Sequence, residues 1–519
     1  MKELTFGEAG RKALANGIEK MSRAVVSTLG PSGQTVVLES QSHTSGMTVT
    51  KDGVTVAKAI QLKDPVENLA VRMMRQAAEK TALTAGDGTT TSVVLTEALV
   101  RAGMEGLSVS ELNKVVVLRE LLRYRDEALG ALRVHRMTKR RLKDVARISA
   151  NNDKSLGNII AQAYESIGKG GVVTVENSST VETYVRVTNG IRMDRGWSSQ
   201  LFVNNAKSDE CVMEDVYVLC TDVEISNILQ VENVLKPIIN GGHKLLLVAP
   251  VTQAVLNTLA ANVVKNGLKL CVVQPPSFGY RQSELMSDLA LSLGTGFYSE
   301  KTGDDLSHLT LQHLGRAERI VVGRDSSVII PGGEVRPEVT ERIAELNEAI
   351  GESSRRSEID FIRQRIAYLD GGVAIVYVGG ETDLEQKERY DRVDDAVCAV
   401  RAALEGGVVA GGGSELLRAT AKLSEPETDE ARLAYEMMVS ALRAPFDAIC
   451  GNAGVRGGDV DWEVIDKEGY GYDALRGEVV NMVEAGVVDP VKVTRNALTN
   501  AVSVASTILS TDTIITFAE

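Results

Sequence analysis

The sequence is poor in aromatic residues and in proline. Aromatic side chains make up 4% of the 519 residues, so the core must be built mainly from valine, leucine, isoleucine and alanine. Only 11 prolines accompany 47 glycines, which indicates many tight turns and flexible joints rather than a disordered chain. The length predicts about two to four domains.

Cysteines and long apolar runs are also scarce. The few cysteines are widely spaced and form no C-x-x-C pair, which is typical of free, buried thiols in a reducing compartment. No apolar run approaches the roughly 20 residues that span a membrane. The first residues, Met1 to Glu8, lack the apolar core of a signal peptide. We therefore expect a soluble, cytoplasmic protein without a membrane partner.

Excess positive charge and clustered histidines are absent as well. The formal net charge is -13, and binding to nucleic acid needs a basic surface, so nucleic acid is not expected as a partner. One basic run, Arg136 to Lys143, is interpreted as a solvated helix face. The 5 histidines form no cluster with acidic residues, which disfavours a metabolic ATPase or small-molecule kinase with its own acid–base set.

A glycine-rich segment, Ala85 to Thr91, is the most informative feature that the sequence does contain. It reads Ala-Gly-Asp-Gly-Thr-Thr-Thr and precedes an amphipathic stretch, Ser92 to Arg101. Gly86 and Gly88 permit close approach of the backbone to an anion, and threonines at a helix N-terminus add donors and a favourable dipole. Asp87 supplies a hard oxygen ligand suited to Mg²⁺. No Walker-type G-x-x-x-x-G-K-[ST] occurs, so this would be a phosphate loop of another design; a helix cap without a ligand is the alternative.

The hydrophobic pattern changes twice along the chain. The first part predicts a strand at 35–39 and helices at 8–29, 64–84, 89–104 and 111–134. Strands then alternate with the helical stretches 252–265 and 283–293; the predicted strands are 170–176, 244–249, 268–273, 319–323 and 371–380. A charged helix at 383–405 leads back to an α-rich region. A discontinuous α domain with an inserted α/β domain and glycine-bearing hinges explains this order, and two independent α domains are the alternative.

Seven short motifs occur in a fixed order along the chain. They are Thr28-Leu-Gly-Pro-Ser-Gly33, Val49-Thr-Lys-Asp-Gly53, Gly86-Asp-Gly-Thr-Thr-Thr91, Ile148-Ser-Ala-Asn151, Met193-Asp-Arg-Gly196, Gly407-Val-Val-Ala-Gly-Gly-Gly413 and Asp489-Pro-Val-Lys-Val-Thr-Arg495. In this order and spacing they closely resemble the group I chaperonins, the GroEL family. The resemblance extends from near residue 1 to about residue 516. Each motif alone is weak, whereas the ordered set is highly specific.

The resemblance implies a multidomain α and α/β subunit with three domains. The equatorial domain would comprise 1–131 and 406–519, the intermediate domain 132–188 and 374–405, and the apical domain 189–373. The resemblance also implies ATP-driven folding of unfolded polypeptides in a homo-oligomeric chamber of stacked seven-membered rings. A small co-chaperonin would be the lid, and Mg²⁺ and K⁺ would support hydrolysis.

The resemblance also implies a nucleotide site. Its ATP-binding positions would be Thr28, Leu29, Gly30, Pro31, Lys51, Asp87, Gly88, Thr89, Thr90, Thr91, Ser149, Gly412, Asp473, Ala474, Val487 and Asp489. Asp87 would bind Mg²⁺, Asp489 would hydrogen-bond the ribose, and Asp473 would lie beside the adenine.

Two acids would carry the chemistry. Asp52 would lie near the attacking water, and Asp395 matches the family's catalytic acid, which orients or activates water and helps to organise Mg²⁺. Taken from the residues alone, Asp395 is a solvated carboxylate on a charged helix, and Lys51-Asp-Gly53 is a common turn. Hydrolysis would depend on positioning and charge neutralisation, because phosphoryl transfer does.

At the implied apical binding groove, the sequence departs more from the family pattern than at the nucleotide site. Five matched positions keep an apolar side chain: Trp197, Leu201, Phe202, Leu235 and Leu256. At three others the family typically has Leu, Val and Val, whereas this chain has Glu232, Ala260 and Ala261. The lost methylenes remove on the order of 1–2 kcal/mol of burial per site, and a carboxylate adds a desolvation cost. We therefore expect weaker or altered client and lid binding, so a specialised paralogue is the alternative to a general folding chamber.

Two charged pairs match subunit contacts of the family. Asp153 and Arg195 match a pair that bridges neighbouring subunits. Asp447 and Arg456 stand where the family has Arg and Glu in a contact between rings. A swap at both members preserves a pair among identical subunits but disfavours mixing with ordinary ones.

Overall fold

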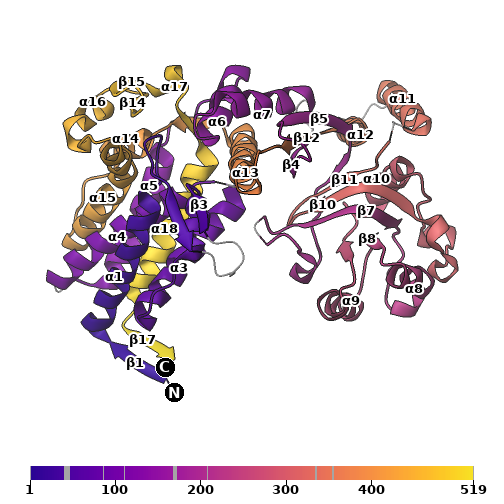
Figure 1. Cartoon of the computed structure of the whole chain (residues 1–519), viewed down its shortest axis with the longest axis horizontal. Helices are drawn as coiled ribbons and strands as arrows, with labels where there is room; N and C mark the ends of the chain where they lie inside the picture. The colour runs from indigo at the N-terminus through magenta and orange to yellow at the C-terminus, as the bar shows by residue number, and fades with distance from the viewer. Residues whose placement is uncertain are drawn as a thin grey trace. The chain divides into compact units, whose positions relative to one another are not determined.

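The computed structural model describes residues 2–39, 47–85, 87–109, 112–167, 172–206, 208–333, 336–352 and 356–517 (Figure 1). The chain forms two compact units. The first comprises Met1–Ala161, Val175–Thr183 and Val378–Glu519, and the second comprises Gln162–Thr174 and Tyr184–Tyr377. Within the described ranges, no helix is both long and apolar enough to cross a membrane.

The first unit is a helical bundle made from both ends of the chain (Figure 1). Its main helices are α1 (Gly7–Val26), α3 (Pro65–Ala85), α4 (Thr89–Val109), α5 (Lys114–Ala131), α15 (Asp429–Asn452) and α18 (Val491–Ser510). Aliphatic and methionine side chains at helical spacing form one buried core, which includes Met21, Met74, Leu99, Leu442 and Leu498. Because residues before 133 and after 408 share this core, the discontinuous arrangement is correct and two independent α domains are wrong.

Short strands and helices surround this bundle. Each pair of strands is antiparallel: β1 (Lys2–Phe6) with β17 (Thr513–Phe517), β2 (Val36–Glu39) with β3 (Met47–Thr50), β13 (Val408–Ala410) with β16 (Val488–Pro490), and β14 (Tyr470–Asp473) with β15 (Glu478–Asn481). The remaining helices are α2 (Gly53–Ala59), α6 (Lys139–Ser149), α7 (Lys154–Ile167), α13 (Asp383–Gly406), α14 (Ser414–Ala419), α16 (Asp461–Asp466) and α17 (Met482–Ala485). The predicted helix at 383–405 is confirmed as α13.

The second unit is built on a six-stranded sheet in the order β6-β11-β10-β7-β8-β9. These strands are β6 (Ile191–Met193), β7 (Cys211–Cys220), β8 (Lys244–Val248), β9 (Leu270–Val273), β10 (Gly315–Val322) and β11 (Ser327–Ile330). Strands β7, β8 and β9 are parallel, and the intervening helices are α8 (Glu232–Asn240) and α9 (Gln253–Asn266). The predicted α/β alternation is therefore confirmed, with fully buried aliphatic strands, as expected where helices cover a parallel sheet.

Further elements complete this unit and the connections to it. A three-stranded sheet has the order β4-β12-β5, formed by β4 (Val172–Asn177), β12 (Gly372–Val378) and β5 (Tyr184–Asn189). Three helices, α10 (Gly279–Leu293), α11 (Pro337–Glu352) and α12 (Arg356–Leu369), pack on one another. A bidentate ion pair joins two of them, since Arg365 donates to both oxygens of Asp288 at 2.7 Å.

Candidate functional site

The loop between α3 and α4 is shaped for an anion. Gly88 has a φ of +89°, and a Cβ at this position would lie 2.5 Å from Cγ1 of Val493 on α18, so only glycine fits. The Ser92 N–H donates to the Gly88 carbonyl at 3.0 Å and closes the first turn of α4. The preceding N–H groups, of Thr89 to Thr91, therefore have no acceptor within the helix. Gly86, which also belongs to the predicted loop, lies outside the described residues.

A buried hydroxyl in this loop has no partner. Thr89 is 4% exposed, and its Oγ1 atom makes no hydrogen bond among the described residues. An unpaired buried polar atom costs about 1–3 kcal/mol. A phosphate oxygen at the helix N-terminus would satisfy this hydroxyl, so the residues present fit a phosphate-bearing ligand.

Asp52 is brought next to the loop by the start of α2. Its carboxylate caps α2, accepting from the N–H groups of Val54 and Thr55 at 3.0 Å and from the Thr55 hydroxyl at 2.6 Å. Gly53 packs so closely on Thr90 that a Cβ would lie 2.1 Å from its Oγ1 atom. The predicted turn is thus a helix start, and it fixes the direction of the Asp52 carboxylate.

At this site the Asp87 carboxylate is repelled by that of Asp52 and repels that of Asp489. Burial raises the pKa of Asp87, the Gly88 N–H opposes this effect, and the negative charge of Asp52 raises the pKa further. Burial also raises the pKa of Asp489 to about 7; the charge of Asp87 adds to this, and a hydrogen bond from the Gly412 backbone opposes it. Negative charges held close together in a partly buried site are stabilised by a bound cation, so this arrangement is consistent with a cation site.

The described residues do not supply a complete metal cage. Among them, no group of three or more His, Cys, Asp or Glu side chains is placed to hold a metal ion. Mg²⁺ is usually held by one or two carboxylates together with substrate phosphates and water. Asp87 beside a phosphate loop fits that pattern.

The loop after α1 forms a second part of the site. Gly30 has a φ of +81°, and a Cβ at Gly33 would lie 2.1 Å from the Thr28 carbonyl oxygen, so both glycines are required by the turn. The side-chain amide of Asn452 donates to the carbonyls of Val26 at 3.0 Å and of Leu29 at 2.9 Å. These two bonds hold the predicted segment Thr28 to Pro31 against the end of α15. Sequence reasoning missed Asn452, because no local signal connects positions more than 400 residues apart.

The glycine triplet after β13 forms a third part. Gly412 and Gly413 have φ angles of +66° and +72°, and the Gly411 N–H donates to the Val487 carbonyl at 3.0 Å. Strand β16 places Asp489 opposite Val409 of β13. The two predicted segments, around Gly412 and around Val487 to Asp489, therefore lie together.

Asp395 lies on α13, two turns before Ala402, which packs beside the loop. Ala402 of α13 packs in a buried cluster with Ala85 and Val493, which flank the loop. Asp395 is partly buried and precedes Ala402 by seven residues, so it lies on the same helix face about 10 Å away along the axis. The helix therefore directs Asp395 toward the side of α13 that carries the loop.

Other predicted nucleotide residues lie on neighbouring elements. Lys51 is exposed after β3, and Ser149 ends α6. Asp473 is buried at the β14–β15 turn, where its carboxylate accepts from the N–H groups of Leu475 and Arg476 at 3.0 and 3.3 Å. Ala474 follows it, partly buried. The carboxylate of Asp473 thus completes its own turn.

Most of the predicted apical groove residues are buried in the subunit. Leu201 is 53% exposed, whereas Phe202, Leu235 and Leu256 are between 2% and 6% exposed. Trp197 donates through Nε1 to the Asp209 carbonyl at 3.0 Å. Of the three departures, Ala260 is buried, Ala261 is partly buried, and Glu232 pairs with Lys236 at 2.8 Å on α8.

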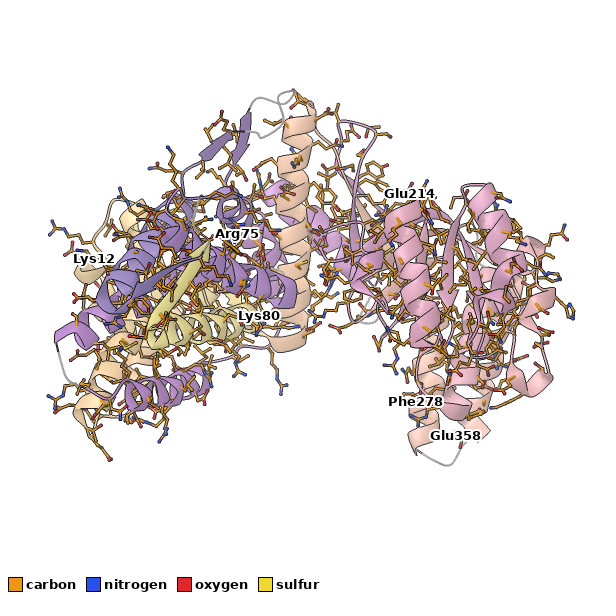
Figure 2. The ribbon with its side chains drawn as sticks, turned by 90° about the horizontal axis from the view of Figure 1, so that it is seen from below. Lys12, Arg75, Lys80, Glu214, Phe278 and Glu358 are labelled. Carbon is orange, nitrogen blue, oxygen red and sulfur yellow. The ribbon has the colours of Figure 1, made fainter. Side chains whose placement is uncertain are left out.

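The predicted subunit-contact residues have partners within the chain. Asp153 caps α7 by accepting from the Ser155 N–H at 2.8 Å and the Leu156 N–H at 3.1 Å. The Arg195 guanidinium lies 5.6 Å from the ring centre of Phe278, which is 80% exposed and is labelled in Figure 2.

Asp447, the predicted partner of Arg456, lies beside the residue that follows Arg456. A Cβ on Gly457, the residue after Arg456, would lie 2.0 Å from the Asp447 carboxylate. Asp447 also forms an ion pair with Arg443 at 3.7 Å.

Comparison with known proteins matches the chain to one family. The model of the TCP-1/cpn60 chaperonin family matches residues 21–518. The chaperonin gp146 from bacteriophage EL 2 (Pseudomonas aeruginosa), crystallised in the presence of ATP-BeFx, has a similar fold. In one crystal form the TM-score is 0.70 at 22% sequence identity, with 99% of each chain covered. In a second crystal form the TM-score is 0.63 with the same identity and coverage.

Proposed function

This chain belongs to the TCP-1/cpn60 chaperonin family, and we propose that it is an ATP-hydrolysing chaperone subunit of the group I type. The observation that carries the proposal is the start of α4, where Gly88 and the unpaired Thr89 hydroxyl form an anion cradle beside three carboxylates. The ATP analogue present with the phage chaperonin gp146 supports a nucleotide as the ligand.

Each residue of the cradle has a defined task in this proposal. The N–H groups of Thr89, Thr90 and Thr91 bind phosphate oxygens, and Lys51, directly after β3, adds a positive charge. Asp87 holds Mg²⁺ with those oxygens. When bound, Mg²⁺ neutralises the charge that develops on the phosphates. K⁺ is proposed as a further supporting ion, without an assigned ligand set.

Two acids act on the water. Asp52 is fixed as the cap of α2, and a lone pair not used by the cap accepts a hydrogen bond from the attacking water. Asp395 approaches from α13, where it orients that water or accepts its proton. The face of α13 that carries Ala402 packs beside the loop. A movement of α13 brings Asp395 to the phosphates and completes the site, which couples hydrolysis to movement of the helix.

The adenosine part of ATP binds on the other two parts of the site. Thr28 to Pro31 form one wall, and Gly412 approaches the ribose, whose hydroxyls bond to Asp489. Val487 and Ser149 lie at the margin, and the Asp473–Ala474 turn lies beside the adenine. Because the Asp473 carboxylate is engaged by its own turn, recognition of the base there depends mainly on shape.

The proposal extends to the assembly. The equatorial, intermediate and apical domains comprise the five segments given above, and identical subunits form a seven-membered ring, single or double. The ring encloses non-native polypeptides beneath a co-chaperonin lid. Asp153 and Arg195 contribute to contacts between subunits.

Substitution of Asp395 tests the catalytic assignment. In Asp395→Ala, ATP hydrolysis is expected to fall about 100-fold while ATP binding is retained, because general acid–base groups contribute factors of this order. Asp383→Ala removes an acid from the first turn of the same helix and should leave the rate within about twofold. Equal rates for the two variants would contradict the assignment.

A specialised paralogue with reduced client or lid binding is the second candidate. Glu232 and Ala260 in the groove, and the burial of Phe202, Leu235 and Leu256, favour it. Refolding of a denatured client, with and without a lid protein, separates the two. The mass of the native particle with ATP and with ADP tests the chamber itself: a monomer under both conditions would contradict a ring while leaving the ATP site in place.

A further inference from the structure

The basic helix α6 lines a cavity that the nucleotide site does not use. The cavity has a volume of about 180 Å³ and opens to solvent between α6 and α7. Its lining residues are Lys143, Asp144, Arg147, Lys154 and Asn158. Three cationic side chains thus face one carboxylate and one amide, so the lining carries an excess of positive charge.

The Arg147 guanidinium of this cavity is incompletely matched. Asp144 and Arg147 are 3.9 Å apart, at the outer limit of an ion pair. The Nε atom of Arg147 is buried and has no hydrogen-bond partner among the described residues. Burial raises the pKa of Asp144, although Arg147 and its neighbours oppose this effect. A buried guanidinium donor without an acceptor favours an anion at this position.

The walls of the cavity are held at a fixed spacing. Gly157 of α7 packs against α6 so closely that a Cβ would lie 2.8 Å from the Arg147 Cα atom. Arginine presents planar, parallel donors to an anion, whereas lysine supplies a point charge. One arginine, two lysines and the Asn158 amide, on two fixed helices, supply the donors and positive charge that a phosphate group needs.

Two arginines of α6, Arg147 in the cavity and Arg140 outside it, contact a wall of the proposed nucleotide site. Arg147 donates to the Gly486 carbonyl at 3.3 Å, and Arg140 donates to the Glu484 carbonyl at 2.9 Å. A Cβ on Gly486 would lie 2.5 Å from the Asp144 carboxylate. Val487 follows directly and bonds to Gly411. An anion that draws Arg147 toward the cavity therefore acts on the segment that leads to Asp489.

We propose that the α6–α7 cavity binds a small phosphate anion, inorganic phosphate or pyrophosphate, and that its occupancy changes the affinity of the nucleotide site. The first part rests only on the cavity, and the second rests on the proposed function. Because coupling is reciprocal, nucleotide then changes the affinity of the cavity for the anion by the same factor.

Binding of labelled pyrophosphate to the full chain, measured by equilibrium dialysis, tests the first part. Excess ADP is added to occupy the proposed nucleotide site. We expect ADP-insensitive binding that weakens about tenfold or more in the double variant Lys143→Ala/Lys154→Ala, which removes two charged contacts. The control Lys12→Ala/Lys422→Ala removes the same charge from exposed positions outside the cavity and should match the wild type; Lys12 is labelled in Figure 2.

The outcomes separate the two proposals. Equal pyrophosphate affinity in the cavity variant and the wild type, or no ADP-insensitive binding, would overturn the cavity site. If ADP does not bind at all, the proposed function fails, while the difference between the two double variants still reports on the cavity. For the coupling, we expect inorganic phosphate to change ADP affinity about threefold or more in the wild type and the control. An equal change in the cavity variant would overturn it.

Discussion

The pKa of Asp489 on β16 is strongly altered by its surroundings in the candidate site. Its ordinary pKa of 3.8 is raised to about 7, chiefly by burial and then by the charge of Asp87. Between these two values, the folded protein without nucleotide holds a proton that the unfolded chain has lost. The free energy of unfolding therefore falls as the pH rises through this window, and the loss is complete above pH 7.

Asp489→Asn removes this effect. At pH 8 the variant without nucleotide should be more stable than the wild type, by up to about 4 kcal/mol, because the amide stays neutral. At pH 4 the two proteins should unfold alike, since the wild-type carboxyl is then protonated in the folded state. Urea unfolding at both pH values measures the difference, and an equal gain at pH 4 and pH 8 would contradict the assigned cause.

Residues of the candidate site could be predicted from the sequence where the residue type alone indicates a role. Asp87, Gly88 and the threonines follow from a glycine-rich turn before a helix. The roles of Asp52 and Asp473 as caps of their own helix and turn did not follow, because a carboxylate near glycine suits both a cap and a ligand. Burial of Phe202 also escaped, since an apolar residue suits a groove as well as a core.

Among the helices, α10 and α12 of the second unit are joined by a buried ion pair. Arg365 and Asp288 are 3% and 1% exposed and share two hydrogen bonds. Loss of Asp288 removes both bonds and leaves the buried Arg365 with its ion pair to the partly buried Glu284, at 2.5 Å. Breaking a buried pair costs about 3–5 kcal/mol.

Substitution of one partner should therefore destabilise this unit. Asp288→Ala is expected to lower its free energy of unfolding by about 3–5 kcal/mol, measured by urea unfolding followed by circular dichroism. The control Glu345→Ala removes an exposed partner of Arg342 and should change the free energy by less than about 1 kcal/mol. A similar loss in both variants would indicate a general effect of charge removal.

Helices and strands with a regular apolar pattern were well predicted from the sequence, and a strand with an interrupted pattern was not. The helix predicted at 252–265 is α9, and the strand predicted at 244–249 is β8. Strand β7 was missed because Glu214 and Asp215 interrupt its apolar pattern. Asp215 has a φ of 50°, and its pairing with β10 is interrupted while the register is the same on both sides, so the extended backbone is distorted there without an inserted residue.

At the scale of the whole molecule, the reactivity of the cysteines tests whether the cores of both units are packed as described. Four of them, Cys211, Cys220, Cys271 and Cys450, are buried, and Cys398 is partly buried. Burial raises the pKa of Cys220 and of Cys450 to about 12, although a hydrogen bond from Cys271 lowers that of Cys211. The folded protein should expose at most one fast thiol to a disulfide reagent, and denaturant should release all 5. Rapid reaction of several thiols in the folded state would contradict the packing of the two units.

The single core shared by both ends of the chain has a consequence for synthesis. Helices α3 and α4 leave the ribosome long before α18, which packs against both. Their apolar faces have no permanent cover until translation is almost finished, whereas residues 184–377 are contiguous and can fold as they emerge. During its own synthesis this protein presents the kind of unfinished apolar surface that chaperones bind in other chains.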